Sequence, residues 1–271
     1  MIIDTHSQLT TKEAIDGIPG HLVAGYGGIF HNIAGGGLPG LIADMDEAGV
    51  AKSVVVAIDA VTTHRYAVTN DMVAGAVAAY PDRLIGFASV DPHKGKLAAD
   101  ELEYALGAQG LKGLKIVPNL IEMYADNPAL YPLYEIMQDR QLPVLFHAGT
   151  LFYTGIRLKY GQPVHIDDVA VDFPRLKIII AHFGFPWFYE TLAIAQRNPN
   201  VYFNIAGWRP KYIPQDVMRY ISGALESKSL FGSDYPLLKR AELLRELREL
   251  GVKEKTLRAM TEDNPARLLG L

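Results

Sequence analysis

Eight short apolar runs, separated by amphipathic segments, are the feature that most restricts the fold of this 271-residue chain. After the first run they recur roughly every 25–35 residues, as strand–helix units do. Most are apolar at nearly every position, which is typical of strands buried on both faces and therefore of a parallel sheet. The eight runs comprise residues 2–5, 53–58, 84–90, 113–117, 143–146, 177–181, 201–206 and 231–234.

The segments between these runs carry helical patterns, several of which stop at Gly or Pro. Eight such units in a chain of this size favour a closed barrel over an open doubly wound sheet, and no Gly-rich nucleotide-binding pattern follows any run. We therefore predict an α/β fold, a (β/α)₈ TIM barrel, as a single domain over 1–271 with a Gly-rich lid loop at 9–40 after the first strand. The expected helices cover residues 41–49, 70–80, 97–106, 128–140, 166–173, 187–197, 214–225, 239–250, 254–260 and 264–269.

Composition narrows the function classes. The net charge of −4 leaves no basic footprint for nucleic acid. The chain has no cysteine, which excludes disulfides and thiolate metal sites. The opening Met-Ile-Ile-Asp-Thr-His lacks the charge and long apolar core of a signal peptide, and no apolar run is long enough to span a bilayer. We expect a cytoplasmic protein that acts on a small molecule, not on nucleic acid or a membrane.

Polar side chains stand at the ends of several predicted strands. His6, His147 and His182 each end an apolar run, Asp234 ends the last one, and Lys115 lies in the fourth. In a TIM barrel these ends form the active site, and closure places the eighth strand beside the first. Three imidazoles and a carboxylate suit one divalent ion, Zn²⁺ first, with Mn²⁺ or Mg²⁺ as alternatives. Asp234 is the candidate catalytic group that accepts a proton from metal-activated water.

Other residues suggest how a substrate is held. Lys115 or Arg209 can pair with a substrate carboxylate, and Phe152, Tyr153 and Trp208 can wall a pocket for a flat molecule. Each has a structural alternative. Lys115 can neutralise a buried acid, Arg209 can be a surface residue, the aromatic side chains can pack beneath loops, and any one His can be structural.

The strand ends also resemble a known family, the amidohydrolase superfamily. The likeness is to the branch that contains metal-dependent hydrolases and non-oxidative decarboxylases of the aminocarboxymuconate-semialdehyde type. It spans the whole chain in order. The segments that carry it are residues 3–6 (IDTH), 111–115 (LKGLK), 145–149 (LFHAG), 180–184 (IAHFG), 231–236 (FGSDYP) and 264–269 (NPARLL).

The resemblance implies a TIM barrel with one metal ion held by His6, His147 and Asp234. It implies that His182 is a further ligand or a catalytic group beside the metal. One position departs from the family pattern, which has a second His two residues after the first, where this chain has Gln8. An amide oxygen is a weak ligand. The change leaves room for weakened metal binding or for a metal-free protein.

Three functions follow from these residues. The leading hypothesis is a metal-dependent hydrolase that cleaves a C–O or C–N bond of a small carboxylated, cyclic or aromatic substrate. The runner-up is a metal-dependent, non-oxidative decarboxylase of an aromatic or muconate-like acid. A third is a metal-free binding protein that has lost catalysis. By analogy with the family, a homodimer or homotetramer is expected.

Overall fold

The computed structural model describes residues 1–23, 36–151 and 153–271. Within them, a three-stranded sheet (order β1-β2-β5) and a five-stranded sheet (order β10-β9-β8-β7-β6) consist of parallel strands. The strands are β1 (Ile2–Gln8), β2 (Val50–Val56), β5 (Leu84–Phe87), β6 (Leu114–Ile116), β7 (Pro143–Phe146), β8 (Lys177–Ile180), β9 (Val201–Asn204) and β10 (Ser229–Leu230).

Two parallel bridges join the sheets into one ring. Ala88 bridges to Leu114 between β5 and β6, and Ser7 bridges to Tyr235 between β1 and the segment after β10. Where β1 meets the segment after β10, the Asp234 amide donates to the His6 carbonyl oxygen over 2.8 Å. The ring confirms the predicted (β/α)₈ barrel. The last strand was expected at 231–234, but the strand that pairs with β9 is β10, which ends before residue 231. The chain then turns at Asp234, whose φ of 58° no extended strand allows.

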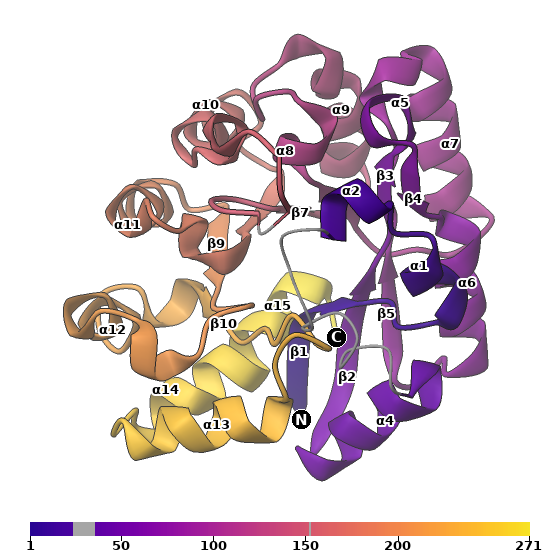
Figure 1. Ribbon diagram of the computed structural model, residues 1–271. Coiled ribbons are helices and arrows are strands. Elements are labelled where there is room, and N and C mark those ends of the chain that lie inside the picture. Colours follow the sequence, from indigo (N-terminus) through magenta and orange to yellow (C-terminus); the bar gives the residue numbers. More distant parts are fainter. Residues whose placement is uncertain (24–35, 152) are drawn as a thin grey trace.

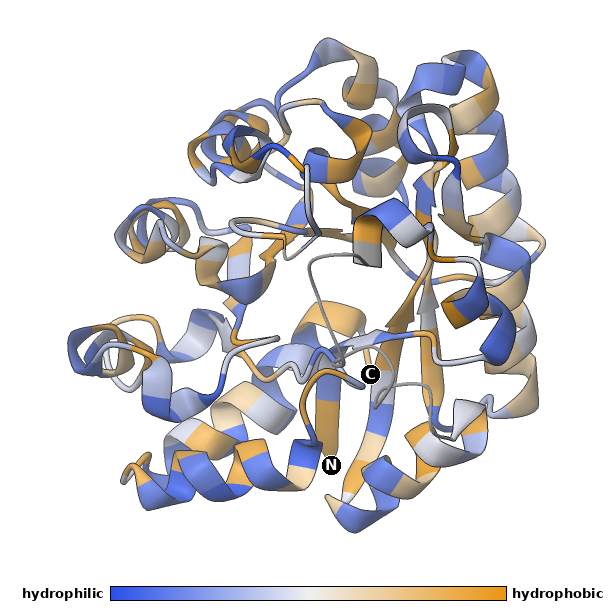
Figure 2. Ribbon diagram, in the orientation of Figure 1, coloured by the Kyte–Doolittle hydropathy of each residue, from blue (hydrophilic) through white to orange (hydrophobic). Residues whose placement is uncertain are grey.

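Helices surround the ring on its outer side, as Figure 1 shows. Figure 2 shows that apolar residues concentrate on the strands and on the helix faces turned toward them. Inside the ring, Leu268 of the C-terminal helix packs with Val54, Leu145 and Ile179, which come from three different strands. The main helices are α4 (Gly37–Glu47), α6 (Asn70–Ala79), α7 (Lys96–Gly107), α9 (Tyr131–Asp139), α10 (Val164–Asp172), α11 (Phe188–Arg197), α12 (Gln215–Ile221), α13 (Arg240–Glu249), α14 (Glu254–Arg258) and α15 (Asn264–Leu269).

Several elements were not predicted. The segment after β2 forms an antiparallel hairpin, β3 (Ile58–Ala60) and β4 (Tyr66–Val68), with α5 (Val61–His64) between its strands. The described part of the expected lid contains α1 (Lys12–Asp16) and α2 (Gly20–Val23), and the Thr11 side chain caps α1 by accepting from the Ala14 amide. The other short elements are α8 (Pro118–Ile121), the π-helical turn Ala259–Asp263 and the 3₁₀ turns Pro92–Lys94, Pro128–Leu130, Leu158–Gly161, Ala181–Gly184, Pro210–Tyr212 and Glu226–Lys228.

Residues 24–35, which the prediction also placed in the lid, lie outside the described residues. Among the helices in the rest of the chain, none combines the length and apolar character that crossing a bilayer would require. Figure 1 shows α1 and α2 lying across one end of the ring, beside the β3–β4 hairpin.

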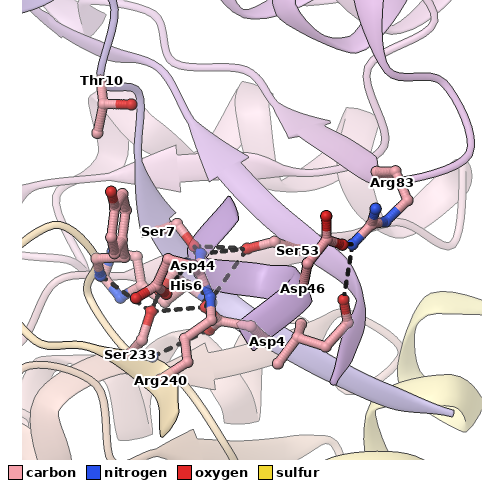
Figure 3. Close-up of polar contacts among 12 residues, drawn as sticks. Asp4, His6, Ser7, Thr10, Asp44, Asp46, Ser53, Arg83, Ser233 and Arg240 are labelled. Carbon is pink, nitrogen blue, oxygen red and sulfur yellow. Dashed lines mark hydrogen bonds and ion pairs between the residues drawn. The ribbon is translucent and has the colours of Figure 1, made fainter. Parts of the chain in front are cut away.

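A buried ion pair connects the first strand, β1, to helix α13 (Figure 3). Arg240 and Asp4 are both fully buried, and Arg240 Nε donates to Asp4 Oδ2 over 2.6 Å. Arg240 also pairs with Asp44 of α4 over 2.6 Å and donates to the hydroxyls of Ser7 and Ser53. One guanidinium therefore links α13 with β1, β2 and α4, and each of these contacts lies beneath the outer helices.

The Asp4 carboxylate also joins β1 to the segment after β10, where the ring of strands closes. Asp4 Oδ1 accepts from the amides of His6 (3.1 Å) and Ser233 (3.0 Å), and Asp4 Oδ2 accepts from the Ser233 hydroxyl over 2.6 Å. A buried carboxylate is tolerated only when it is paired and hydrogen-bonded in this way. Asp4 thus fixes the backbone at His6 and at the residue before Asp234.

We predict that Arg240→Met lowers the free energy of unfolding by about 3–5 kcal/mol, because it leaves the Asp4 charge buried without its partner. Urea denaturation of the variant measures this loss. Arg245→Met on the same helix is the matched control, since Arg245 and its partner Glu249 are each 64% exposed. It should change the unfolding free energy by less than about 0.5 kcal/mol. Equal effects of the two substitutions would contradict the role assigned to Arg240.

Candidate active site

The polar residues from the strand ends meet at one cavity of about 120 Å³. Gln8, Lys115, His147, His182 and Asp234 line it, and His6 lies fully buried beside them. The His182 ring centroid is 5.0 Å from that of His6 and 4.6 Å from that of His147. His6 Nε2 is 3.8 Å from Asp234 Oδ1. The structure therefore brings together the three histidines and the carboxylate that the sequence singled out.

The hydrogen bonds of His6 and His182 assign their tautomers. His182 Nδ1 lies 2.8 Å from the carbonyl oxygen of Ala206, which can only accept, so Nδ1 carries the proton and Nε2 has the lone pair. His6 Nε2 lies 3.4 Å from both Lys115 Nζ and Gln8 Nε2, which are donors, so this nitrogen is the acceptor. Both rings thus have a basic Nε2.

Burial keeps the three imidazoles neutral. Desolvation lowers the pKa of His6 well below its usual value, and the nearby Lys115, His182 and His147 lower it further. Desolvation, His182 and Lys115 do the same to the pKa of His147. The pKa of His182 is also lowered by desolvation, against the opposing effect of Asp234. Neutral imidazoles are the form that binds a metal or accepts a proton.

Lys115 is a buried cation next to this cluster. It is 2% exposed, and desolvation lowers its pKa to about 7, while Asp234 opposes the shift. An anion bound beside the amine would raise this pKa again, because an opposite charge favours the ammonium. The position of Lys115 therefore favours ligands that carry a negative charge.

Two of the site residues have strained backbones. His182 has a φ of 59° and Asp234 a φ of 58°, in the left-handed region that costs a residue other than glycine roughly 1–2 kcal/mol. Such strain persists only where surrounding contacts impose it, and it is concentrated at functional sites. Here the Asn204 side chain accepts from the His182 amide over 3.3 Å, and the His6 carbonyl accepts from the Asp234 amide. Both turns aim the side chains into the cavity.

Gly207 makes room for these two side chains. A Cβ at this residue would lie 3.1 Å from both Asp234 Oδ2 and His182 Nδ1, and its φ of 74° is a conformation that glycine adopts readily. The backbone after β9 therefore lies close to both side chains. A Cβ at this residue would require Asp234 or His182 to shift by a few tenths of an ångström.

The donor set fits a divalent ion in kind. His147 Nε2 is buried without a hydrogen-bond partner, and the set consists of neutral imidazoles and a carboxylate. Within the described ranges, however, no three His, Asp or Glu side chains meet at metal-binding separations. Gln8 Nε2 donates to Asp234 Oδ1 over 2.8 Å, and Lys115 points at His6 Nε2, so donors occupy the atoms a metal would use. A metal would require both to turn aside.

Of the residues predicted to bind substrate, some line the cavity and some do not. Tyr153 and Trp208 line the cavity, and Trp208 packs against Phe185 with ring centroids 4.4 Å apart. Arg209 does not line it. Its guanidinium pairs with Glu246 and, over 3.3 Å, with Glu242 of α13. These two acids therefore pair with the charge of Arg209 outside the cavity. Phe152 lies outside the described residues.

Sequence patterns missed part of the cavity wall. Tyr66 reaches it from the unpredicted β3–β4 hairpin, and Ile15 and Ile18 reach it from the segment around α1. A signal for the hairpin was present in the β-branched and aromatic residues on either side of the polar turn at 62–65. The apolar spacing of Ala14, Ile15 and Ile18 was a comparable signal for a covering helix.

Comparison with known proteins agrees with this architecture. The chain is 26% identical over 154 residues to the gamma-resorcylate decarboxylase of Polaromonas sp., a match that spans 48% of this chain and 47% of that relative. The match therefore covers about half of the curated relative.

Two solved structures share the fold over nearly the full chain. An uncharacterised TIM-barrel protein of Bordetella bronchiseptica has a TM-score of 0.83 at 24% identity, covering 99% of this chain and 98% of its own. The 5-carboxyvanillate decarboxylase of Novosphingobium aromaticivorans, complexed with manganese and 4-hydroxy-3-methoxy-5-nitrobenzoic acid, has a TM-score of 0.77 at 19% identity, covering 100% and 96%.

The amidohydrolase family model matches residues 3–271, from the first strand to the last residue. Its span includes every strand end that contributes to the cavity. The chain belongs to the amidohydrolase family.

Proposed function

We propose that this protein is a metal-dependent, non-oxidative decarboxylase of an aromatic carboxylic acid. The observation that carries the proposal is the juxtaposition of Asp234, neutral His182 and the buried cation Lys115 in one largely apolar cavity. Similarity to a gamma-resorcylate decarboxylase, and the fold shared with a manganese-bound carboxyvanillate decarboxylase, support this chemistry over the hydrolase that the strand-end residues first suggested.

Different residues of the cavity would bind the metal ion and the substrate carboxylate. A bound divalent ion, held by His6, His147, Asp234 and, after rotation of its amide, Gln8, would supply a positive charge for the substrate carboxylate and its neighbouring oxygen. Lys115 adds a second positive charge that binds and orients the substrate carboxylate. The apolar walls exclude water, which strengthens both interactions.

Decarboxylation replaces the C–CO₂ bond with a C–H bond, so the site must deliver one proton to the ring carbon while CO₂ leaves. Asp234 is placed to carry that proton, because its side chain is 15% exposed and takes a proton from solvent or from a substrate hydroxyl. His182 keeps the Nε2 lone pair and lies near enough to Asp234 for that charge to raise its pKa, so it can accept a proton and return it. The same groups would serve hydrolysis if water were the nucleophile, which makes the choice of products decisive.

We predict that the Mn²⁺-loaded enzyme releases CO₂ from a hydroxybenzoate such as 2,6-dihydroxybenzoate. Asp234→Asn should lower kcat at least about 100-fold, since the amide cannot carry the proton. Product formation is followed by chromatography and by CO₂ detection. Turnover of esters or lactones with no CO₂ from any aromatic acid would instead favour the hydrolase.

We predict that Gly207→Ala lowers kcat at least about tenfold, because the new methyl group displaces Asp234 and His182 from their positions. Steady-state kinetics measures the effect. Gly251→Ala is the matched control, since Gly251 has a similar φ of 76° but nothing within 4 Å of its Cβ position. Both variants introduce the same backbone strain, so equal kcat values in the two would refute the steric role of Gly207.

We predict that Mn²⁺ raises the thermal midpoint of chelator-treated protein and binds close to one ion per chain, because it binds the folded state. His147→Ala should reduce both effects by removing a buried, unpartnered imidazole nitrogen. Elemental analysis and thermal denaturation measure the two quantities. A chain that takes up no Mn²⁺ or other divalent ion would support the metal-free alternative raised by Gln8.

A further inference from the structure

One buried amide side chain links three strand ends of the barrel. Asn204 is the last residue of β9 and is fully buried. Its Oδ1 accepts from the amides of His182 (3.3 Å) and Ala206 (3.2 Å), and its Nδ2 donates to the Thr5 hydroxyl over 3.4 Å. Asn204 therefore joins β9 to the turn after β8 and to β1. It is not among the described residues that line the cavity, so its effect on the site passes through these neighbours.

The partners of Asn204 determine which way its amide points. Both groups at Oδ1 are backbone N–H donors, so only an oxygen fits there. The Thr5 hydroxyl donates its own proton to the Phe231 carbonyl oxygen over 2.7 Å, which leaves its lone pairs for Nδ2 of Asn204. Thr5 and Phe231 are also fully buried, so a rotated amide would leave polar groups without partners. The network therefore has one consistent arrangement.

The same network determines how the His182 ring is held. His182 has a left-handed backbone with a φ of 59°, and Asn204 Oδ1 accepts from its amide. The acceptor for the His182 Nδ1 proton is the carbonyl oxygen of Ala206, and the Ala206 amide donates to the same Oδ1. The tautomer of a histidine is set by the hydrogen bond that its other ring nitrogen makes. Asn204 thus holds both the backbone of His182 and the residue that fixes its tautomer.

Given the decarboxylase function proposed above, we propose that Asn204 is a positioning residue for proton transfer by His182. It keeps the Ala206 carbonyl against Nδ1 of His182, so the lone pair stays on Nε2, the nitrogen that accepts the proton. Through Thr5 it also connects this arrangement to β1 at the residue before His6. Because Asn204 acts through His182, its loss should slow the reaction without weakening substrate binding.

Steady-state kinetics of two asparagine variants tests this role, with the hydroxybenzoate that the wild-type enzyme turns over fastest. Asn204→Ala should lower kcat at least about tenfold and leave KM within about twofold, because it disturbs the proton transfer and not the cavity wall. Asn198→Ala is the matched control. Asn198 precedes β9, is 7% exposed, and donates to Asp167 of α10 and to the Ile194 carbonyl oxygen of α11, away from the strand ends. Its substitution should leave kcat within about twofold. Equal kcat values in the two variants would overturn the role of Asn204.

The tautomer of His182 gives a second measurement that loss of stability alone does not change. Long-range proton–nitrogen NMR spectra of the chelator-treated chain report which ring nitrogen carries the proton, and His182→Gln identifies the signals of this residue. Wild-type protein and Asn198→Ala should show the proton on Nδ1 only. Asn204→Ala should show a second population with the proton on Nε2, because the Ala206 carbonyl is no longer held against Nδ1. A wild-type tautomer in Asn204→Ala would overturn the proposal.

Thr5→Val is the second variant if Asn204→Ala does not fold. It keeps the shape of the side chain but removes the hydroxyl that accepts from Asn204 Nδ2, so the amide can rotate. The kcat should fall at least about threefold and the second tautomer should appear. Wild-type kcat and a wild-type tautomer in Thr5→Val would then overturn the proposal.

The tautomer is measured without turnover, so the two proposals fail separately. If the wild-type protein releases no CO₂ from any aromatic acid, the decarboxylase function is wrong, and the NMR measurement alone decides whether Asn204 positions His182. If CO₂ is released and Asn204→Ala retains the wild-type kcat and tautomer, the function stands and the positioning role is wrong.

Discussion

The carboxylate of Asp4 is the constraint on which the rest of the site depends. One of its oxygens accepts from the amides of His6 and Ser233, and the other accepts from Arg240 and the Ser233 hydroxyl. The junction between the first and last strands is therefore held by a buried ion as well as by backbone hydrogen bonds, such as those from Thr5 to Phe231 and from Asp234 to His6. Because Asp4 lies at this junction, the positions of His6 and Asp234 are set together.

The left-handed backbone at the strand ends follows from that arrangement. An extended backbone at Asp234 would continue the ladder and alternate its side chains between the two faces of the sheet. The left-handed turn instead directs the carboxylate toward His6 and Gln8, while His182 turns in the same way at the end of β8. Gly207 is the complement of both turns, since it leaves the space that their side chains occupy. Three backbone features on three successive strand ends thus define one site.

Much of this could be predicted from the sequence, for an identifiable reason. A strand in a parallel barrel is buried on both faces, so a His or Asp at its end interrupts an apolar run and is easy to locate. His6, His147, His182 and Asp234 were found in this way. The β3–β4 hairpin was not, because its three-residue strands are too short to show a period, and Tyr66 was missed with it. Arg209 was misplaced because sequence does not show which nearby acids, here Glu242 and Glu246, compete for a cation.

Burial decides what chemistry this cluster supports. An exposed imidazole has a pKa of about 6.5. Here desolvation lowers the pKa of each imidazole and leaves its lone pair available. The same desolvation lowers the pKa of Lys115 to about 7, and a carboxylate bound beside the amine would raise this pKa again.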